Sequence, residues 1–219
     1  MNSRILVIGA GGIGGLLAAH VTRAFAFSGQ SRVGNLEMTL MDGDVVDERN
    51  LPHQKFGAND VGEPKVEALV RQLRDVGITE ERGVHLLPVV ADFSADTDLS
   101  KYDLVVVAVD REEPRRLVHE NAEAWLDLRC RGDGFLMWSH LDDMRVLKMF
   151  PPLPDGESAS CQLEDAVENG NIQFGFAEAA SHGAQWVIQW LRGGQVPSAR
   201  TYSIHMGDLP LPMFQEEEE

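Results

Sequence analysis

The chain is poor in cysteine, in basic residues and in long apolar runs. Its 219 residues include two cysteines, too few for a disulfide framework or for a zinc site of four thiolates. We therefore expect a reducing, cytoplasmic setting and no zinc. No stretch approaches the roughly 20 apolar residues of a membrane span. The first residues lead directly into an apolar run, so we expect no signal peptide.

Acidic residues outnumber basic ones, with 35 Asp and Glu against 19 Lys and Arg, and the formal net charge is −16. This balance argues against binding nucleic acid, which requires a cationic surface to displace counterions. Part of the charge lies in the tail 215–219, which we expect to be disordered. The length and the 43% hydrophobic content suit a single domain, which we assign to residues 1–214.

Apolar runs along the chain predict alternating strands and helices. We expect strands over 5–8, 36–41, 84–90 and 104–109, and helices over 16–27, 64–73 and 114–126. Further on, we expect strands over 135–138 and 146–150, a long apolar helix over 174–191 and an edge strand over 201–205. Repeated strand–helix units predict an α/β fold: a Rossmann-like, doubly wound, mostly parallel sheet with a mixed C-terminal extension.

A glycine-rich turn, Gly9-Ala10-Gly11-Gly12-Ile13-Gly14, follows the first predicted strand and opens a helix. Gly9 allows a tight turn, Gly11 lets the backbone approach a phosphate, and Gly14 lets the helix pack on the strand. The free amides and the helix dipole favour an anion at this position. The motif alone suits NAD, FAD, SAM or ATP, and a turn without a ligand is the alternative.

A polar block follows the second predicted strand, comprising Asp42, Asp44, Asn50, His53 and Gln54, and Lys65 opens the next helix. Asp42 stands where a ribose-binding acid is expected, and a surface carboxylate is the other reading. An NAD-dependent dehydrogenase, which the glycine turn alone would allow, leaves this block unexplained.

Asp110 ends the strand predicted over 104–109. Open sheets bind ligands at the carboxyl ends of their strands, so Asp110 is a candidate ligand-binding residue. Capping the following helix is the alternative. Arg115 and Arg116 are expected at the surface.

These blocks together resemble the ThiF/MoeB/ubiquitin-activating-enzyme superfamily. The matching motifs are the glycine turn, Asp42-x-Asp44-x-Val46 leading to Asn50-Leu51-x-x-Gln54, Gly62-x-Pro64-Lys65-Val66-Glu67, and Asp110-x-x-x-x-Arg115. The Cys161 loop and the helix after it are also similar to a ThiF branch of PRTRC plasmid systems. The resemblance implies an adenylyltransferase that uses ATP and Mg²⁺ to activate the C-terminal glycine carboxylate of a ubiquitin-like or sulfur-carrier protein, usually as a homodimer.

The resemblance also implies a role for each candidate residue. Adenylation crowds anions together, so cations must offset their charge. Lys65 would contact the phosphates and Asp110 would hold Mg²⁺, a cation that prefers oxygen ligands. The remaining nucleotide contacts would come from Gly9, Gly11, Gly12, Gly14, Asp42 at the ribose, Asp44, Asn50 and Gln54.

Two departures from the family pattern keep a second hypothesis open. The family has an arginine where this chain has His53, and a neutral imidazole offers one donor in place of a forked cation. Arg49 and Lys55 are the neighbouring cations that we consider as replacements. The family's N-terminal arginine arm is also expected to be missing. The alternative function is therefore an ATP-binding pseudoenzyme or assembly partner.

The cysteines show no paired Cys-x-x-Cys zinc motif. Cys161 lies near the position where thioester-forming relatives carry a cysteine. Two roles are possible for Cys161: a thiol carrier or a plain structural cysteine. Glu157, Glu164 and Asp165 are expected to disfavour its thiolate. Cys130 is expected at a helix end and inert.

Overall fold

The computed structural model describes residues 2–28, 34–148 and 160–211. The acidic tail predicted at 215–219 lies outside these ranges, as do most of the loop that contains Glu157 and the last two residues of the strand predicted over 146–150.

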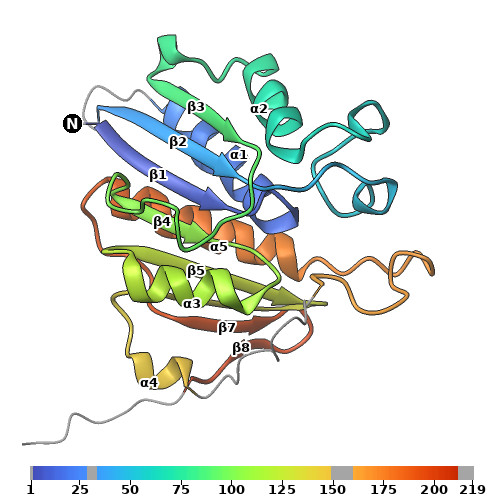
Figure 1. The fold of residues 1–219 in the computed structure, drawn as a ribbon. Helices are drawn as coiled ribbons and strands as arrows, with labels where there is room; N and C mark the ends of the chain where they lie inside the picture. The colour runs from blue at the N-terminus through green and yellow to red at the C-terminus, as the bar shows by residue number, and fades with distance from the viewer. Residues whose placement is uncertain (1, 29–33, 149–159, 212–219) are drawn as a thin grey trace, which may run out of the picture.

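The described chain forms one eight-stranded sheet in the order β3-β2-β1-β4-β5-β6-β7-β8 (Figure 1). The strands from β3 to β5 in this order are parallel, and the pairs from β5 to β8 are antiparallel. This confirms the predicted mostly parallel, doubly wound sheet with a mixed C-terminal part. The parallel strands are β1 (Asn2–Ile8), β2 (Asn35–Met41), β3 (Val84–Val89), β4 (Leu104–Val107) and β5 (Trp125–Arg131), and β6 is Gly134–Ser139.

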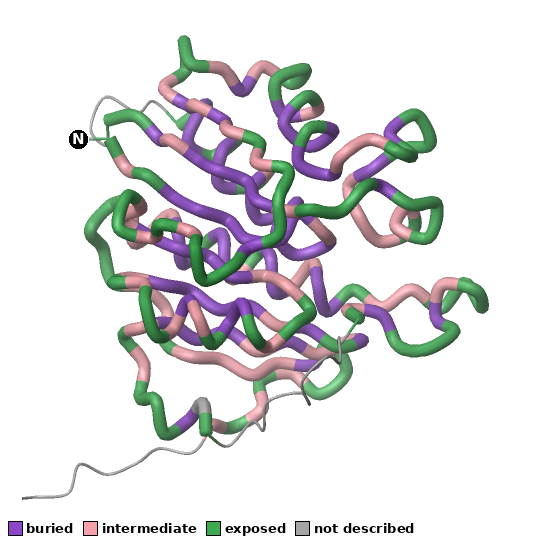
Figure 2. Tube along the Cα trace, viewed as in Figure 1, coloured by how far each residue is buried: buried purple, intermediate pink, exposed green. Residues whose placement is uncertain are grey.

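Helices cover both faces of the sheet. In Figure 1, α1 (Gly12–Phe27) and α5 (Gly175–Leu191) lie behind the sheet and α3 (Glu112–Asn121) lies in front. Successive residues of β1 point to opposite faces, so Ile5 and Val7 join the core of α1, α2 (Lys65–Asp75) and α5, while Leu6 and Ile8 join the smaller core of α3. The central strands are the most continuously buried segments (Figure 2). None of the described helices is long and apolar enough to cross a bilayer.

The strand order reverses direction at β1, which lies between β2 and β4. In open α/β sheets a ligand binds beyond the carboxyl ends of the strands at such a switch point. The glycine turn follows β1 directly, and Asp110 comes shortly after β4. The topology therefore brings the first and last predicted motifs to the same edge of the sheet.

The helix predicted over 114–126 is wrong at its C-terminal end. Helix α3 ends at Asn121, and residues 125–131 form β5, so Cys130 lies in a strand. Strand β5 carries Asp127 and Arg129, charges that a local pattern assigns to the surface. They are buried or half-buried because they pair with residues of α3, which a local pattern does not reveal.

Two C-terminal predictions also need correction. The segment predicted as a strand over 146–150 begins as a short helix, α4 (Met144–Leu147), because the Asp143 side chain accepts the Arg145 N–H at 2.8 Å and caps it. The strand predicted over 201–205 exists as β7 (Arg200–Ser203), but β8 (Gly207–Leu209) pairs with its outer side and is the true edge. Within the described residues there are also three short 3₁₀ turns: η1 (Glu48–Asn50), η2 (Ala58–Asp60) and η3 (Glu80–Arg82).

We predict that Gly14→Ala destabilises the fold by about 3 kcal/mol or more, because the new methyl carbon would lie 1.8 Å from the Gly9 carbonyl oxygen and the turn would have to move. Urea unfolding of the purified variant measures this loss. Gly11→Ala is the matched control, since its methyl would meet only the Gln54 side chain at 3.7 Å, and we expect a loss of about 1 kcal/mol at most. Equal losses in the two variants would contradict the close packing of α1 on the turn.

Candidate functional site

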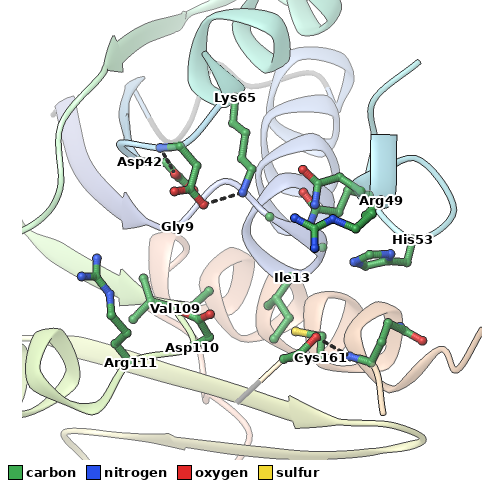
Figure 3. A pocket seen from close by; sticks show the side chains of 18 of the residues that line it. Gly9, Ile13, Asp42, Arg49, His53, Lys65, Val109, Asp110, Arg111 and Cys161 are labelled. Carbon is green, nitrogen blue, oxygen red and sulfur yellow. Dashed lines mark hydrogen bonds and ion pairs between the residues drawn. The ribbon is translucent and has the colours of Figure 1, made fainter. Parts of the chain in front are cut away.

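A cleft of about 1060 Å³ opens beyond the carboxyl ends of the parallel strands. One wall consists of the glycine turn and the segment after β2, and the other consists of residues 108–111 and 160–168. Figure 3 places Asp42 and Lys65 on one side of Gly9, and Asp110 and Cys161 on the other. Segments far apart in the sequence therefore face the same hollow.

The glycine turn brings the end of β1 close to β4. Gly9 has φ +96°, and a methyl carbon there would lie 2.6 Å from the Ala108 carbonyl oxygen. Both the backbone conformation and the close approach therefore require glycine. Gly11 and Gly12 line the cleft, whereas Gly14 packs beneath the turn. The tight turn at Gly9 and the close packing at Gly14 agree with the motif, and the approach of a phosphate to Gly11 stays a prediction.

Asp42 connects the glycine turn to the polar block. One carboxylate oxygen accepts the Ala10 N–H at 2.7 Å, and the other accepts the Asp44 N–H at 2.8 Å. Burial raises the pKa of Asp42, although both hydrogen bonds act in the opposite direction. Asp42 lines the cleft and is half-buried, so it is not the surface carboxylate of the alternative reading.

Lys65 is held against Asp44 at the cleft wall. Its Nζ donates to the Asp44 carboxylate at 2.7 Å, and its own N–H donates to the Asp44 carbonyl at 3.0 Å. The contact forms because residues 44–46 pair with residues 62–65, with a bridge between Val45 and Pro64. The Lys65 side chain is 9% exposed and that of Asp44 is 69% exposed, so the cation is fixed while its partner faces water.

The Asn50–Gln54 segment winds back over the glycine turn. The Asn50 side chain accepts the Asp47 N–H at 3.0 Å and so fixes η1, while the Asn50 carbonyl accepts the Gln54 N–H at 2.8 Å. The Gln54 amide then lies against Gly11. Among the described residues, neither Gln54 Oε1 nor His53 Nδ1 has a hydrogen-bond partner, although both atoms are buried. These are polar groups at the cleft that a ligand or water can satisfy.

His53 is a neutral residue of the cleft near pH 7. Burial lowers the pKa of His53 below its ordinary value, and the nearby Lys65 ammonium lowers it further. Of the two neighbouring cations considered as replacements for the family arginine, Arg49 lines the cleft and Lys55 does not. The Arg49 side chain is 84% exposed and pairs with Asp47 at 3.1 Å. Arg49 is therefore close to the site but not fixed against it.

Asp110 is exposed in the cleft and makes no hydrogen bond to any described residue. The helix that follows has Arg111 at its N-cap position, without a side-chain cap, so the capping alternative for Asp110 is wrong. No group of three or more His, Cys, Asp or Glu residues in the described ranges can hold a metal ion by itself. A single free carboxylate nonetheless fits Mg²⁺ that arrives with nucleotide phosphates, because Mg²⁺ commonly takes one or two protein carboxylates and keeps several waters.

Arg115 is buried, which corrects its predicted place at the surface; Arg116 is exposed as predicted. The Arg115 guanidinium donates to Asp127 and to the Val109 carbonyl, the residue before Asp110, and to the Leu128 carbonyl at 3.2 Å. It thereby fixes the backbone from which Asp110 projects.

Cys161 lines the cleft, and its pKa lies below its ordinary value, which differs from the expectation that neighbouring acids disfavour its thiolate. The adjacent Cys130 thiol and the buried Arg115 lower this pKa, whereas burial of Cys161 and the Asp110 carboxylate act in the opposite direction. Glu164 and Asp165 are exposed to water, and Glu157 lies outside the described residues.

Asp92, Arg111 and Arg131 are among the cleft residues that the sequence analysis does not name. Asp92 follows β3 much as Asp42 follows β2, so its position was available from the strand pattern, and it pairs with Arg111 at 3.2 Å. Arg131 ends β5, a strand that the sequence analysis does not predict, so its place in the cleft has no sequence signal.

The chain is similar to known proteins over most of its length. The profile of the ThiF family matches residues 1–206. The chain is 29% identical over 172 residues to "Probable adenylyltransferase/sulfurtransferase MoeZ" of Mycobacterium tuberculosis, covering 73% of the chain and 41% of MoeZ. It is 28% identical over 174 residues to "SAMP-activating enzyme E1" of Haloferax volcanii, covering 78% of the chain and 57% of that enzyme. The chain thus spans about half the length of these curated relatives.

Solved structures give the same fold. MccB of E. coli superposes with a TM-score of 0.65 at 18% identity, covering 99% of the chain and 67% of MccB. MccB in complex with ATP superposes with a TM-score of 0.61 at 17% identity, covering 95% of the chain and 64% of MccB.

We predict that His119 makes the fold less stable as the pH falls. Its Nε2 lies 3.1 Å from Asp127, but two guanidiniums already hold that carboxylate. Burial, with repulsion from Arg129 and Arg115, lowers the pKa of His119 from 6.5 to about 4. The unfolded chain therefore takes up a proton that the folded protein excludes. The contribution of His119 is fully present above pH 6.5, and about 3 kcal/mol of stability is lost as the pH falls to 4.

Urea unfolding between pH 7 and pH 4 measures this loss, and His119→Gln should flatten the slope relative to the wild type. His20→Gln, at an exposed helix position, is the control and should keep the wild-type slope. Identical slopes for the wild type and His119→Gln would contradict the prediction.

Proposed function

The chain belongs to the ThiF family, and we propose that it is an ATP-dependent adenylyltransferase that converts the C-terminal carboxylate of a small ubiquitin-like or sulfur-carrier protein into an acyl-adenylate. One observation carries the proposal: the glycine turn, the Asp42–Gln54 block, Lys65 and Asp110 all line one cleft at the switch point of the sheet. A dinucleotide-dependent dehydrogenase would use the glycine turn and an acid such as Asp42, but it would not require Asn50, Gln54, Lys65 or Asp110.

The reaction explains why such groups belong together. An oxygen of the carrier carboxylate bonds to the α-phosphorus of ATP, the bond from that phosphorus to the bridging oxygen breaks, and pyrophosphate leaves with the electron pair. Two anions must approach each other, so fixed donors and cations lower the barrier. When bound, Mg²⁺ would offset the charge of the phosphates, and Asp110 is the residue that we propose holds it.

Each remaining residue receives a role from its contacts. Lys65 is already fixed beside the glycine turn, and we propose that a phosphate replaces exposed Asp44 as its partner. Asp42 accepts ribose hydroxyls with its remaining lone pairs, while Asn50 and Gln54 hydrogen-bond ribose or phosphate. The amides of Gly11 and Gly12 receive phosphate at the start of α1, and Gly9 and Gly14 shape the turn.

The carrier protein is proposed from the relatives' names together with the cleft. By their names, one relative combines adenylyltransferase and sulfurtransferase activities and another activates SAMP proteins. MccB has been solved with MccA. We propose that the tail of the carrier enters along the wall formed by Asp110 and residues 160–168, opposite Lys65. We also propose a homodimer, as the family resemblance implies.

The second candidate function is an ATP-binding pseudoenzyme or assembly partner, favoured by the neutral His53. The two functions differ in one outcome: the pseudoenzyme binds Mg-ATP but releases no pyrophosphate with any carrier protein. Calorimetric titration with Mg-ATP, with NAD as the comparison ligand, is the first test. Binding of Mg-ATP alone supports both candidates, and binding of NAD alone would overturn both.

We predict that Lys65→Ala abolishes ATP-dependent pyrophosphate release, lowering kcat/KM by about 100-fold or more, because a fixed charge-assisted contact to phosphate is lost. Release is measured with a coupled pyrophosphatase assay in the presence of carrier protein. Lys55→Ala is the matched control, because Lys55 lies close in sequence but outside the cleft lining, and it should retain wild-type turnover. Wild-type turnover by Lys65→Ala would overturn the assignment.

We predict that His53→Arg lowers the KM for Mg-ATP about tenfold, because a permanent guanidinium replaces a neutral ring and one charge-assisted hydrogen bond contributes about 1.5–3 kcal/mol. Steady-state kinetics across a range of Mg-ATP concentrations measure the change. His53→Gln, which keeps a neutral donor, should behave like the wild type. A higher KM in His53→Arg than in His53→Gln would show that phosphate does not reach this position.

A further inference from the structure

The two cysteines of the chain meet at one wall of the cleft. Cys130 lies in β5 and is buried, whereas Cys161 lies 31 positions later and lines the cleft. The Cys130 thiol donates to the Cys161 carbonyl oxygen at 3.7 Å, so the buried thiol lies directly beside the backbone of the second cysteine. Since the sequence contains no other cysteine, its only two thiols are neighbours in space.

The backbone around the two thiols is already held in place. The Gly132 N–H donates to the Cys161 carbonyl at 2.9 Å, and the Gly175 N–H donates to the Gly132 carbonyl at 3.1 Å. The Gln162 side chain adds two hydrogen bonds to the backbone of Gln173, at 2.8 and 2.9 Å. These bonds hold the start of the 160–174 segment beside the end of β5, so the two cysteines stay next to each other.

The two thiols differ in reactivity. The neighbouring Cys130 thiol and the buried Arg115 lower the pKa of Cys161, although burial of Cys161 acts in the opposite direction, whereas the neighbouring Cys161 and burial both raise the pKa of Cys130. Cys161 is also the partly exposed one and faces the cleft. An oxidant therefore reaches the more acidic thiol first, and a second thiol waits directly behind it.

We propose that Cys130 and Cys161 form a reversible intramolecular disulfide when the protein meets a peroxide. The Cys161 thiolate attacks one oxygen of hydrogen peroxide, which gives a sulfenic acid and releases hydroxide. Cys130 then attacks the Cys161 sulfur, forms the S–S bond, and releases water after proton transfer. In total, two thiols and one peroxide give one disulfide and two waters, and a dithiol reductant reverses the oxidation.

The bond would change the cleft without requiring a change of fold. It removes the thiol that faces the cleft, and it ties the 160–168 wall covalently to β5, the strand that also holds Asp127 behind Asp110. Oxidation would therefore act on the wall opposite Lys65. The inference does not depend on the proposed adenylation, because the chemistry needs only the two thiols and a peroxide.

The test is thiol mapping by mass spectrometry on the purified, reduced chain. After treatment with hydrogen peroxide, we expect the wild type to become two hydrogens lighter, to lose both alkylatable thiols together, and to regain both with dithiothreitol. A peptide cross-link between Cys130 and Cys161 should appear after digestion. A rise in Tm on oxidation is also expected, since a cross-link restricts the unfolded chain.

Matched variants isolate each thiol. In Cys130→Ser the second thiol is missing, so Cys161 should stop at the sulfenic acid and be trapped by dimedone. In Cys161→Ser, Cys130 should stay reduced under the same peroxide treatment. Circular dichroism checks that both variants are folded.

Three outcomes would overturn the inference. One is a dimedone adduct on Cys161 of the wild type while Cys130 remains alkylatable. Another is a cross-link between two chains on a non-reducing gel in place of the internal bond. The third is a wild type that keeps both thiols reduced under the peroxide treatment. None of these outcomes bears on ATP binding, so a failure here is distinguishable from a failure of the proposed function.

Discussion

The carboxylate of Asp42 is the interaction on which the cleft depends. It accepts one backbone N–H from the glycine turn after β1 and another from the polar block after β2. The Asp44 segment held in this way pairs with residues 62–65 and so fixes Lys65 at the start of α2. A single half-buried acid therefore determines where the glycine turn and Lys65 lie relative to each other. Burial of Asp42 in this arrangement raises its pKa, and the two backbone hydrogen bonds offset part of that rise.

Charge is the second constraint, because a chain of net charge −16 is proposed to bind a polyanion. Its cations in the described cleft are mostly committed: Lys65 pairs with Asp44, Arg49 with Asp47, and Arg111 with Asp92. His53 adds no charge near neutral pH. The cleft therefore has little excess positive potential, and anion binding must rely on fixed amides, on exchange of the Asp44 partner and on a cation carried with the ligand.

The opposite wall depends on a different set of contacts. Buried Arg115 links Asp127 of β5 to the backbone beside Asp110, and the neighbouring thiols link β5 to the 160–174 segment. Buried ion pairs of this kind contribute little net stability but are costly to break, so they hold geometry. This wall thus holds the backbone at Asp110 in place and carries Cys130 and Cys161, the two thiols that we propose are oxidised. The chain spans about half the length of its curated relatives. Entry of a carrier protein along this wall is therefore proposed for the chain and is not taken over from the relatives.

The sequence by itself determined the first four parallel strands, β1 to β4, the glycine turn, the position of Asp42 after β2 and the family. Each of these features depends on residues that are close in the sequence. The strands follow from apolar runs, the turn follows from glycines at fixed spacing, and the family follows from the order of the motifs along the chain. Tertiary structure alone decided that Asp127 and Arg129 belong to a buried strand, that Arg115 is internal, that Arg131 reaches the cleft and that Cys130 meets Cys161. Those outcomes depend on partners far away in the chain, because a charge is buried only when an opposite charge is brought to it and a thiol becomes more acidic only when a donor is placed beside it. The local sequence pattern does not indicate such distant partners. The cleft wall of residues 108–111 and 160–168, with its two neighbouring cysteines, is therefore recognised only in the folded structure.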